Sequence, residues 1–121
     1  MKISFTDREA DVMRVLWDHG PSVVSEVQSR LSDKLAYTTV LTVLRTLEAK
    51  GYVGHDEEGR QHRYFSSVQQ QAAQKSALQH LLSKFFKNSS ELLFARLVSE
   101  EKLSAEQIRR MRKLLDGKRK S

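Results

Sequence analysis

Segment 37–65 constrains the fold more than any other part of the chain, because a helical pattern ends there at a glycine and an extended pattern follows at once. Apolar residues recur every three or four positions across 37–50, which predicts a helix with a single buried stripe. Gly51 supplies the left-handed conformation that commonly ends a helix. The stripe consists of Val40, Val43, Leu44 and Leu47.

A basic hairpin is predicted directly after this helix. An extended run begins at Tyr52-Val53, a turn is expected over Asp56-Glu57-Glu58-Gly59, and the return strand 61–65 alternates its side chains between two faces. This pattern places three basic side chains at or near the hairpin tip: Arg60, His62 and Arg63.

The helix face opposite the buried stripe carries small hydroxyls and one arginine in place of alternating Glu and Lys. A helix of this size beside a cationic hairpin is typical of proteins that read duplex DNA. Leu41 is suited to a thymine methyl group and Arg45 to a guanine edge or a phosphate, while the three basic hairpin residues would hold the DNA backbone. We expect the following residues to enter the major groove: Thr38, Thr39, Leu41, Thr42 and Arg45.

Two further helices are predicted upstream. Thr6 and Glu9 form a capping-box pattern before a helix that stops at Gly20-Pro21, and a second short helix covers roughly 24–31. Trp17 is expected to anchor the core and not to stack on a ligand. The fold class is therefore mainly α: a winged helix-turn-helix domain over 1–67, with three helices and a wing of two or three strands, followed by a helical region.

Residues 68–121 are predicted to form three amphipathic helices, the last two capped near Asn88 and Ser104. Their apolar faces exceed what about 50 residues can bury, so we expect 68–121 to be a dimerisation region. The alternative is that these helices fold back on the first domain as one core. The residues expected in the dimer contact are Leu78, Leu81, Leu82, Phe85, Leu93, Leu97, Ile108, Met111 and Leu115.

Composition excludes several classes of function. The chain has no cysteine, its four histidines lack metal-ligand spacing, and no nucleophile motif, paired carboxylates or phosphate loop is present, so we expect no enzyme, no metal and no cofactor. Neither a membrane span nor a signal peptide is expected, which predicts a cytoplasmic protein. The net charge of +6 resides in the second half: residues 1–67 hold nine Lys and Arg against ten Asp and Glu, and residues 68–121 hold twelve against five.

The chain closely resembles the penicillinase-repressor family of BlaI/MecI type. This resemblance implies a homodimer that binds a palindromic DNA operator through its winged helices and represses genes of β-lactam resistance. It also implies a membrane-bound sensor protease that relieves repression by cutting the dimerisation region. The residues that carry the resemblance are Thr6-Asp7-Arg8-Glu9, Val15-Leu16-Trp17, Gly20-Pro21, Glu26-Val27, residues 36–44, Leu47, Lys50-Gly51 and residues 59–64.

Two departures from the family pattern limit the resemblance. The cleaved members carry an Asn-Phe bond in the fifth helix, where this sequence aligns Arg96-Leu97, so we expect any protease cut to fall between Leu92 and Lys102 but at a different bond. A copper-responsive branch carries a C-terminal cysteine cluster that this chain lacks. The rival interpretation is a winged-helix protein-interaction module without specific DNA binding, because winged helices also dock proteins and residues 1–67 are slightly acidic.

Overall fold

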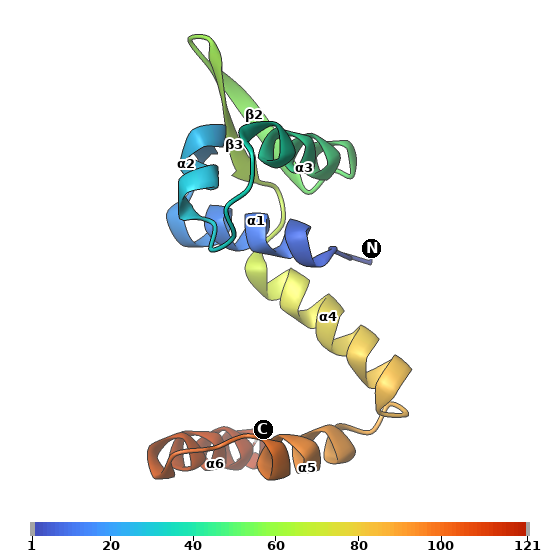
Figure 1. Ribbon diagram of the computed structural model, residues 1–121. Coiled ribbons are helices and arrows are strands. Elements are labelled where there is room, and N and C mark those ends of the chain that lie inside the picture. Colours follow the sequence, from blue (N-terminus) through green and yellow to red (C-terminus); the bar gives the residue numbers. More distant parts are fainter. Residues whose placement is uncertain (1, 121) are drawn as a thin grey trace. The chain divides into compact units, whose positions relative to one another are not determined.

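The computed structural model describes residues 2–120, which form two compact units divided after Leu78. The N-terminal unit contains the predicted winged helix, and the protein is mainly helical with one small sheet (Figure 1). Its elements are α1 (Asp7–His19), β1 (Ser22–Val23), α2 (Val24–Arg30), α3 (Tyr37–Ala49), β2 (Val53–Glu58) and β3 (Gln61–Ser66). Helix α4 (Gln70–Phe85) crosses the boundary, and α5 (Ser90–Glu100) and α6 (Ala105–Lys120) belong to the C-terminal unit.

Helix α1 begins as predicted. The Thr6 hydroxyl accepts the Glu9 amide at 3.1 Å, and the Glu9 carboxylate accepts the Thr6 amide at 2.8 Å, which completes a capping box. Gly20 ends the helix with a φ of 80°. Trp17 packs against the core beside Phe5, as expected, and it is partly exposed.

The core of the N-terminal unit lies between α1, α2, α3 and the sheet. The predicted stripe of α3 supplies Val40, Leu44 and Leu47, each fully buried, while Val43 is only half-buried. Tyr64 of β3 closes the core from the sheet side with 1% of its surface exposed. The other buried apolar residues are Val12, Met13, Val15, Leu16, Val23, Val24, Val27, Tyr52 and Val53.

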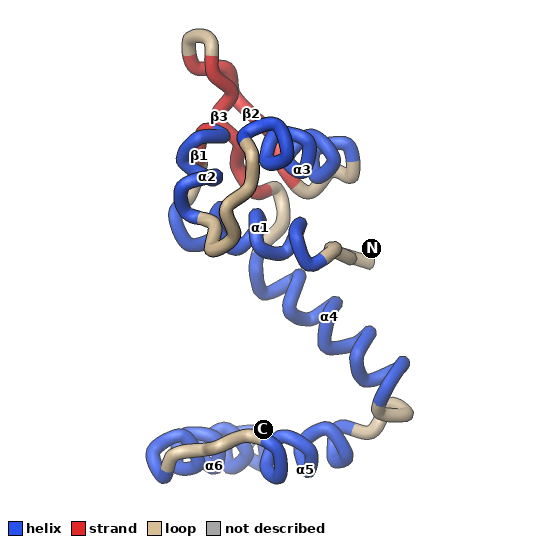
Figure 2. Tube along the Cα trace, viewed as in Figure 1, coloured by secondary structure: helices blue, strands red, loops and turns tan. Residues whose placement is uncertain are grey.

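The sheet has three antiparallel strands in the order β1-β3-β2, and Figure 2 shows the β2–β3 hairpin extending beyond α2 and α3. The prediction that the turn begins at Asp56 was wrong: residues 56–58 belong to β2, and the turn is Gly59-Arg60. Cross-strand pairing explains the longer strand, because Asp56 lies opposite Arg63 and Glu57 opposite His62, so that carboxylates face basic side chains.

The start of α4 is fixed to the N-terminal unit. The Trp17 indole N–H donates to the Val68 carbonyl at 2.9 Å and to the Ser66 hydroxyl at 3.1 Å. Further along α4, the Ser76 hydroxyl donates to the Ile3 carbonyl at 2.8 Å and accepts the Ile3 amide at 3.1 Å. These bonds explain why the compact unit extends to Leu78. The assignment of DNA binding to residues 1–67 and of dimerisation to residues 68–121 stays a prediction.

Helices α5 and α6 begin at serine caps. The Ser89 hydroxyl accepts the Leu92 amide at 3.0 Å, so the cap lies within the predicted segment 88–91, and Asn88 before it adopts a left-handed φ of 59°. Ser104 and Gln107 form the predicted reciprocal pair before α6, with bonds of 2.9 and 3.0 Å.

Candidate nucleic-acid interface

The exposed face of α3 carries hydroxyls and one guanidinium. Thr38, Thr42, Arg45 and Thr46 are all exposed. The Thr42 hydroxyl donates to the Thr38 carbonyl at 2.9 Å, and the Thr46 hydroxyl donates to the Thr42 carbonyl at the same distance. These bonds hold both side chains in one rotamer, and they leave the methyl groups and the oxygen lone pairs available to a partner.

The remaining predicted contact residues of α3 lie at the edge of this face. Thr39 and Leu41 are half-buried, and Leu41 packs partly against the core. The helix therefore presents Thr38, Thr42 and Arg45 most fully, with the other two side chains beside them.

One face of the β2–β3 hairpin packs toward α3 and carries two histidines. The His55 Nδ1 lies 2.6 Å from a carboxylate oxygen of Glu48 on α3, and the imidazole rings of His55 and His62 are stacked with centroids 4.2 Å apart. His62 is half-buried on the hairpin and lies near its tip, opposite Glu57 of β2. Sequence reasoning missed Glu48 as the residue that joins the helix to this hairpin face.

Arg45 lies close to this junction. The pKa of the Tyr64 hydroxyl is raised, first by burial and then by the negative charge of Glu48, while the Arg45 guanidinium opposes the shift. Arg45 is thus near the Tyr64 hydroxyl and also exposed on the outer face of α3.

The other hairpin face carries Arg63, which the structure surrounds with acceptors. Its guanidinium forms ion pairs with Glu58 and with Glu26 of α2, and it donates to the Pro21 carbonyl. Arg60, in contrast, is exposed in the turn itself. In the sequence, Glu26 stood out as part of the Glu26-Val27 pattern of the family resemblance, and its pairing with Arg63 was missed because 37 residues separate the two.

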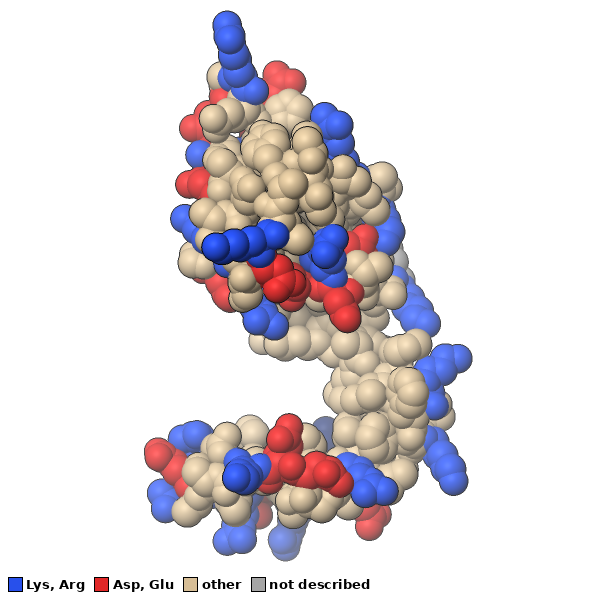
Figure 3. Space-filling model, viewed as in Figure 1, with Lys and Arg blue, Asp and Glu red and all other residues tan. Residues whose placement is uncertain are grey.

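The charged side chains surround an uncharged area. Figure 3 shows this broad area over α2 and α3 on one face of the N-terminal unit, with basic and acidic side chains around it and a basic side chain at the hairpin tip. Acidic side chains of β2 lie opposite the basic side chains of β3, so the hairpin is not uniformly cationic. Of the three basic side chains of the hairpin, Arg60 is the one most accessible to a polyanion.

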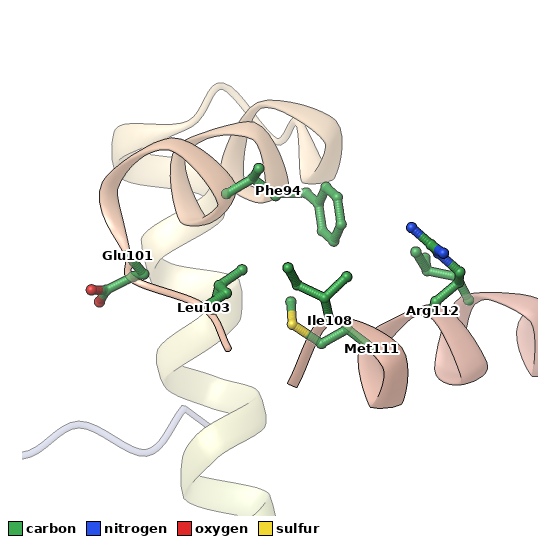
Figure 4. A pocket seen from close by; sticks show the side chains of 8 residues that line it. Phe94, Glu101, Leu103, Ile108, Met111 and Arg112 are labelled. Carbon is green, nitrogen blue, oxygen red and sulfur yellow. The ribbon is translucent and has the colours of Figure 1, made fainter. Parts of the chain in front are cut away.

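The predicted dimerisation residues lie in α4, α5 and α6. Leu82, Leu93 and Met111 are half-buried, and the other six are exposed, including Phe85 with 71% of its surface accessible. No residue of α4 or α5 is buried. Apolar side chains of α5 and α6 line an open cavity of about 470 Å³, where Phe94, Ile108 and Met111 converge (Figure 4).

Within residues 2–120, no three His, Cys, Asp or Glu side chains are arranged to hold a metal ion. Among the helices described, none combines the length and apolarity that a membrane span requires.

Comparison with known proteins gives consistent matches. The family model described as penicillinase repressor matches residues 5–117. The penicillinase repressor of Bacillus licheniformis is 26% identical over 113 residues, which cover 92% of this chain and 88% of that protein. The methicillin resistance regulatory protein MecI of Staphylococcus aureus is 22% identical over 114 residues, 91% of each chain. The solution structure of the DNA-binding domain of the repressor BlaI is similar with a TM-score of 0.51 and 32% identity, covering 58% of this chain and 90% of that domain.

Proposed function

Because this chain belongs to the penicillinase repressor family, we propose that it is a homodimeric transcriptional repressor that binds a palindromic operator in the cytoplasm. The single observation that carries this proposal is the outer face of α3, where Thr38, Thr42, Arg45 and Thr46 are exposed together and no carboxylate lies among them. A face of this composition suits the edges of base pairs, because guanidinium groups donate to guanine and threonine methyl groups contact thymine.

Helix α3 reads the major groove in this proposal. Thr38, Thr42 and Arg45 contact base edges, and Thr39 and Leu41 contribute at the margin of the same face. Arg60 in the turn and His62 on the hairpin contact the phosphate backbone, which sets the register of the protein on the duplex. The family's named relatives, a penicillinase repressor and a methicillin resistance regulator, favour β-lactam resistance genes as the targets.

Dimerisation uses the apolar faces of α4, α5 and α6. Among the described residues, every large apolar side chain that is exposed lies at or after Leu78, with the exception of Tyr37. An apolar surface of this extent is characteristic of an interface. A twofold dimer would cover these side chains and would present two α3 helices to two half-sites, which explains why the operator should be palindromic.

Selection of bound fragments from the source genome tests the proposal. We expect enrichment of a palindromic duplex that binds about 10³-fold or more tightly than random DNA, with an affinity that falls as salt rises. Arg14→Ala, which changes an exposed arginine of α1, is the matched control for changes on α3. Absence of any salt-sensitive duplex binding would refute the proposal and would favour the protein-interaction module.

A further inference from the structure

Arg63 is held by groups from β2, from α2 and from the loop between α1 and β1. Its Nε donates to Glu58 of β2, and its Nη1 lies 3.2 Å from the Pro21 carbonyl and 3.3 Å from Glu26 Oε1 of α2. The backbone fixes the same junction, because Val23 of β1 pairs with Arg63 of β3. The side chain therefore ties the hairpin to the segment that leads into α2.

Glu26 is itself fixed in place. The carboxylate oxygen that accepts Arg63 also accepts the Val23 amide at 3.0 Å. The pKa of Glu26 is lowered, first by this backbone hydrogen bond and further by the charges of Arg63 and Arg30. Glu26 is consequently ionised at neutral pH and gives Arg63 a rigid acceptor on α2.

The local charge does not favour a phosphate at Arg63. One guanidinium is shared between Glu26 and Glu58, and Asp56 lies opposite Arg63 across the strands. With Arg30 also acting on Glu26, three carboxylates and two guanidinium groups leave a net negative charge around Arg63, which disfavours a DNA phosphate there. Arg60 forms no ion pair with any other residue of the described part of the chain, 2–120, and it stands in the turn beyond this cluster.

We propose that Arg63 is a positioning residue: it holds the hairpin against α2 so that Arg60 meets the DNA backbone, and it does not itself bind phosphate. This proposal rests on the proposed DNA-binding function, and it assigns Arg63 a different role from the one expected from the sequence. The planar fork of arginine is essential to the role, because its Nε and Nη1 atoms reach different acceptors and an ammonium group cannot reproduce that geometry.

Salt dependence of operator binding by the full-length protein tests the assignment. The slope of the logarithm of the binding constant against the logarithm of salt concentration, here called the salt slope, counts the phosphate contacts. Arg60→Ala should lower the salt slope by about one unit. Adding Arg63→Met to Arg60→Ala should lower affinity no more than about twofold and leave the salt slope at the value of Arg60→Ala. In the wild-type background, Arg63→Lys should lose affinity by about five- to twentyfold, as Arg63→Met does, although lysine keeps the charge. A further drop in slope of about one unit in the double variant would overturn the proposal, as would near wild-type binding by Arg63→Lys.

For Glu58→Gln, the two roles of Arg63 predict changes in operator affinity of opposite direction. The Glu58 side chain is 61% exposed, so the fold tolerates this substitution. If Arg63 positions the hairpin, loss of this carboxylate weakens operator binding about two- to fivefold. If Arg63 binds phosphate, removal of a competing negative charge strengthens binding, and that outcome would contradict the proposal.

Hydrogen exchange without DNA separates this proposal from the proposed function. In the free protein, Arg63→Met should speed exchange of the β1–β3 and β2–β3 amides, while Arg60→Ala should leave it unchanged. This result would support the positioning role of Arg63 even if the protein bound no duplex DNA. Equal protection of these amides in wild type and Arg63→Met would refute that role even if the operator were bound normally.

Discussion

At the residue scale, Arg45 is the side chain of α3 that we expect to contribute most to operator recognition. Its exposed guanidinium lies opposite the buried stripe of the helix, and Arg45→Ala should therefore weaken operator binding by roughly 1 to 3 kcal/mol with little effect on folding. Affinity should be measured on the operator and on random duplex, with Arg14→Ala as the control. Equal losses on both duplexes would indicate a phosphate contact, and unchanged operator affinity would exclude Arg45 from the interface.

Glu9 is a buried carboxylate whose charge stabilises the folded state. Burial acts to raise its pKa, but the hydrogen bonds from Lys50 and from the Thr6 amide outweigh burial and hold the pKa below the ordinary 4.5. The folded-state pKa is thus below the unfolded value, so this stabilisation is present above the ordinary pKa and is lost as pH falls through the folded value.

We therefore expect Glu9→Gln to lower the free energy of unfolding by roughly 1 to 3 kcal/mol at pH 7. The difference from wild type should shrink as pH falls from about 4.5 toward the lower folded-state pKa, because Glu9 is protonated first in the unfolded chain and only at still lower pH in the folded protein. Urea denaturation at several pH values measures both effects, with Lys50→Gln as the partner variant. A difference that stays constant down to pH 3 would contradict this account.

At the scale of elements, Trp17 joins α1 to the end of β3 and the start of α4. Its indole N–H donates to Val68 and Ser66, and both acceptors lie about 50 residues away in sequence. Trp17→Phe keeps an aromatic ring beside Phe5 but removes this donor, so the free energy of unfolding should fall by about 1 to 3 kcal/mol. Amide exchange should also rise at the first turn of α4, and a loss below 0.5 kcal/mol with unchanged exchange would show that the bond is not required.

At the scale of the whole molecule, dimerisation should depend on the chain beyond Leu78. A fragment of residues 1–78 keeps the Trp17 and Ser76 hydrogen bonds, so it should be folded and monomeric. It should bind one half-site about a hundredfold more weakly than the full chain binds the operator, because the second half-site is no longer tethered. Sedimentation velocity of both proteins at equal concentration checks this, and a dimer of the fragment would place the interface in the N-terminal unit.

Proteolytic release would require a cut in the C-terminal unit at a bond other than Asn-Phe. Arg96 and Leu97 lie within α5, where Arg96 pairs with Glu100 at 3.6 Å. We expect any induced cut to fall between Leu92 and Lys102, since separation of α6 would weaken the dimer. Intact-mass measurement of the repressor from induced cells decides this. A full-length protein released from its operator would show that a ligand, a partner or protein concentration controls repression.

The order of elements could be predicted from the sequence because local interactions decide it. The Thr6 capping box, the apolar stripe of α3 and the stop at Gly51 involve residues within about one helical turn of one another. The resemblance to the repressor family rests on the same short patterns, and the matching family model confirms it. The hairpin was predicted with its turn too early, because propensity could not reveal that three acidic residues pair across the strands.

The surroundings of the basic hairpin residues were decided only by the tertiary structure. The sequence placed Arg60, His62 and Arg63 together as three cations, but the register of β1 on β3 brings Arg63 to Glu26, and packing of the hairpin on α3 brings His55 to Glu48 and stacks His62 on His55. Arg63 and Glu26 are 37 residues apart, and their contact depends on how two elements pack. Charge is a property of the residue, whereas the partner that neutralises it is a property of the fold.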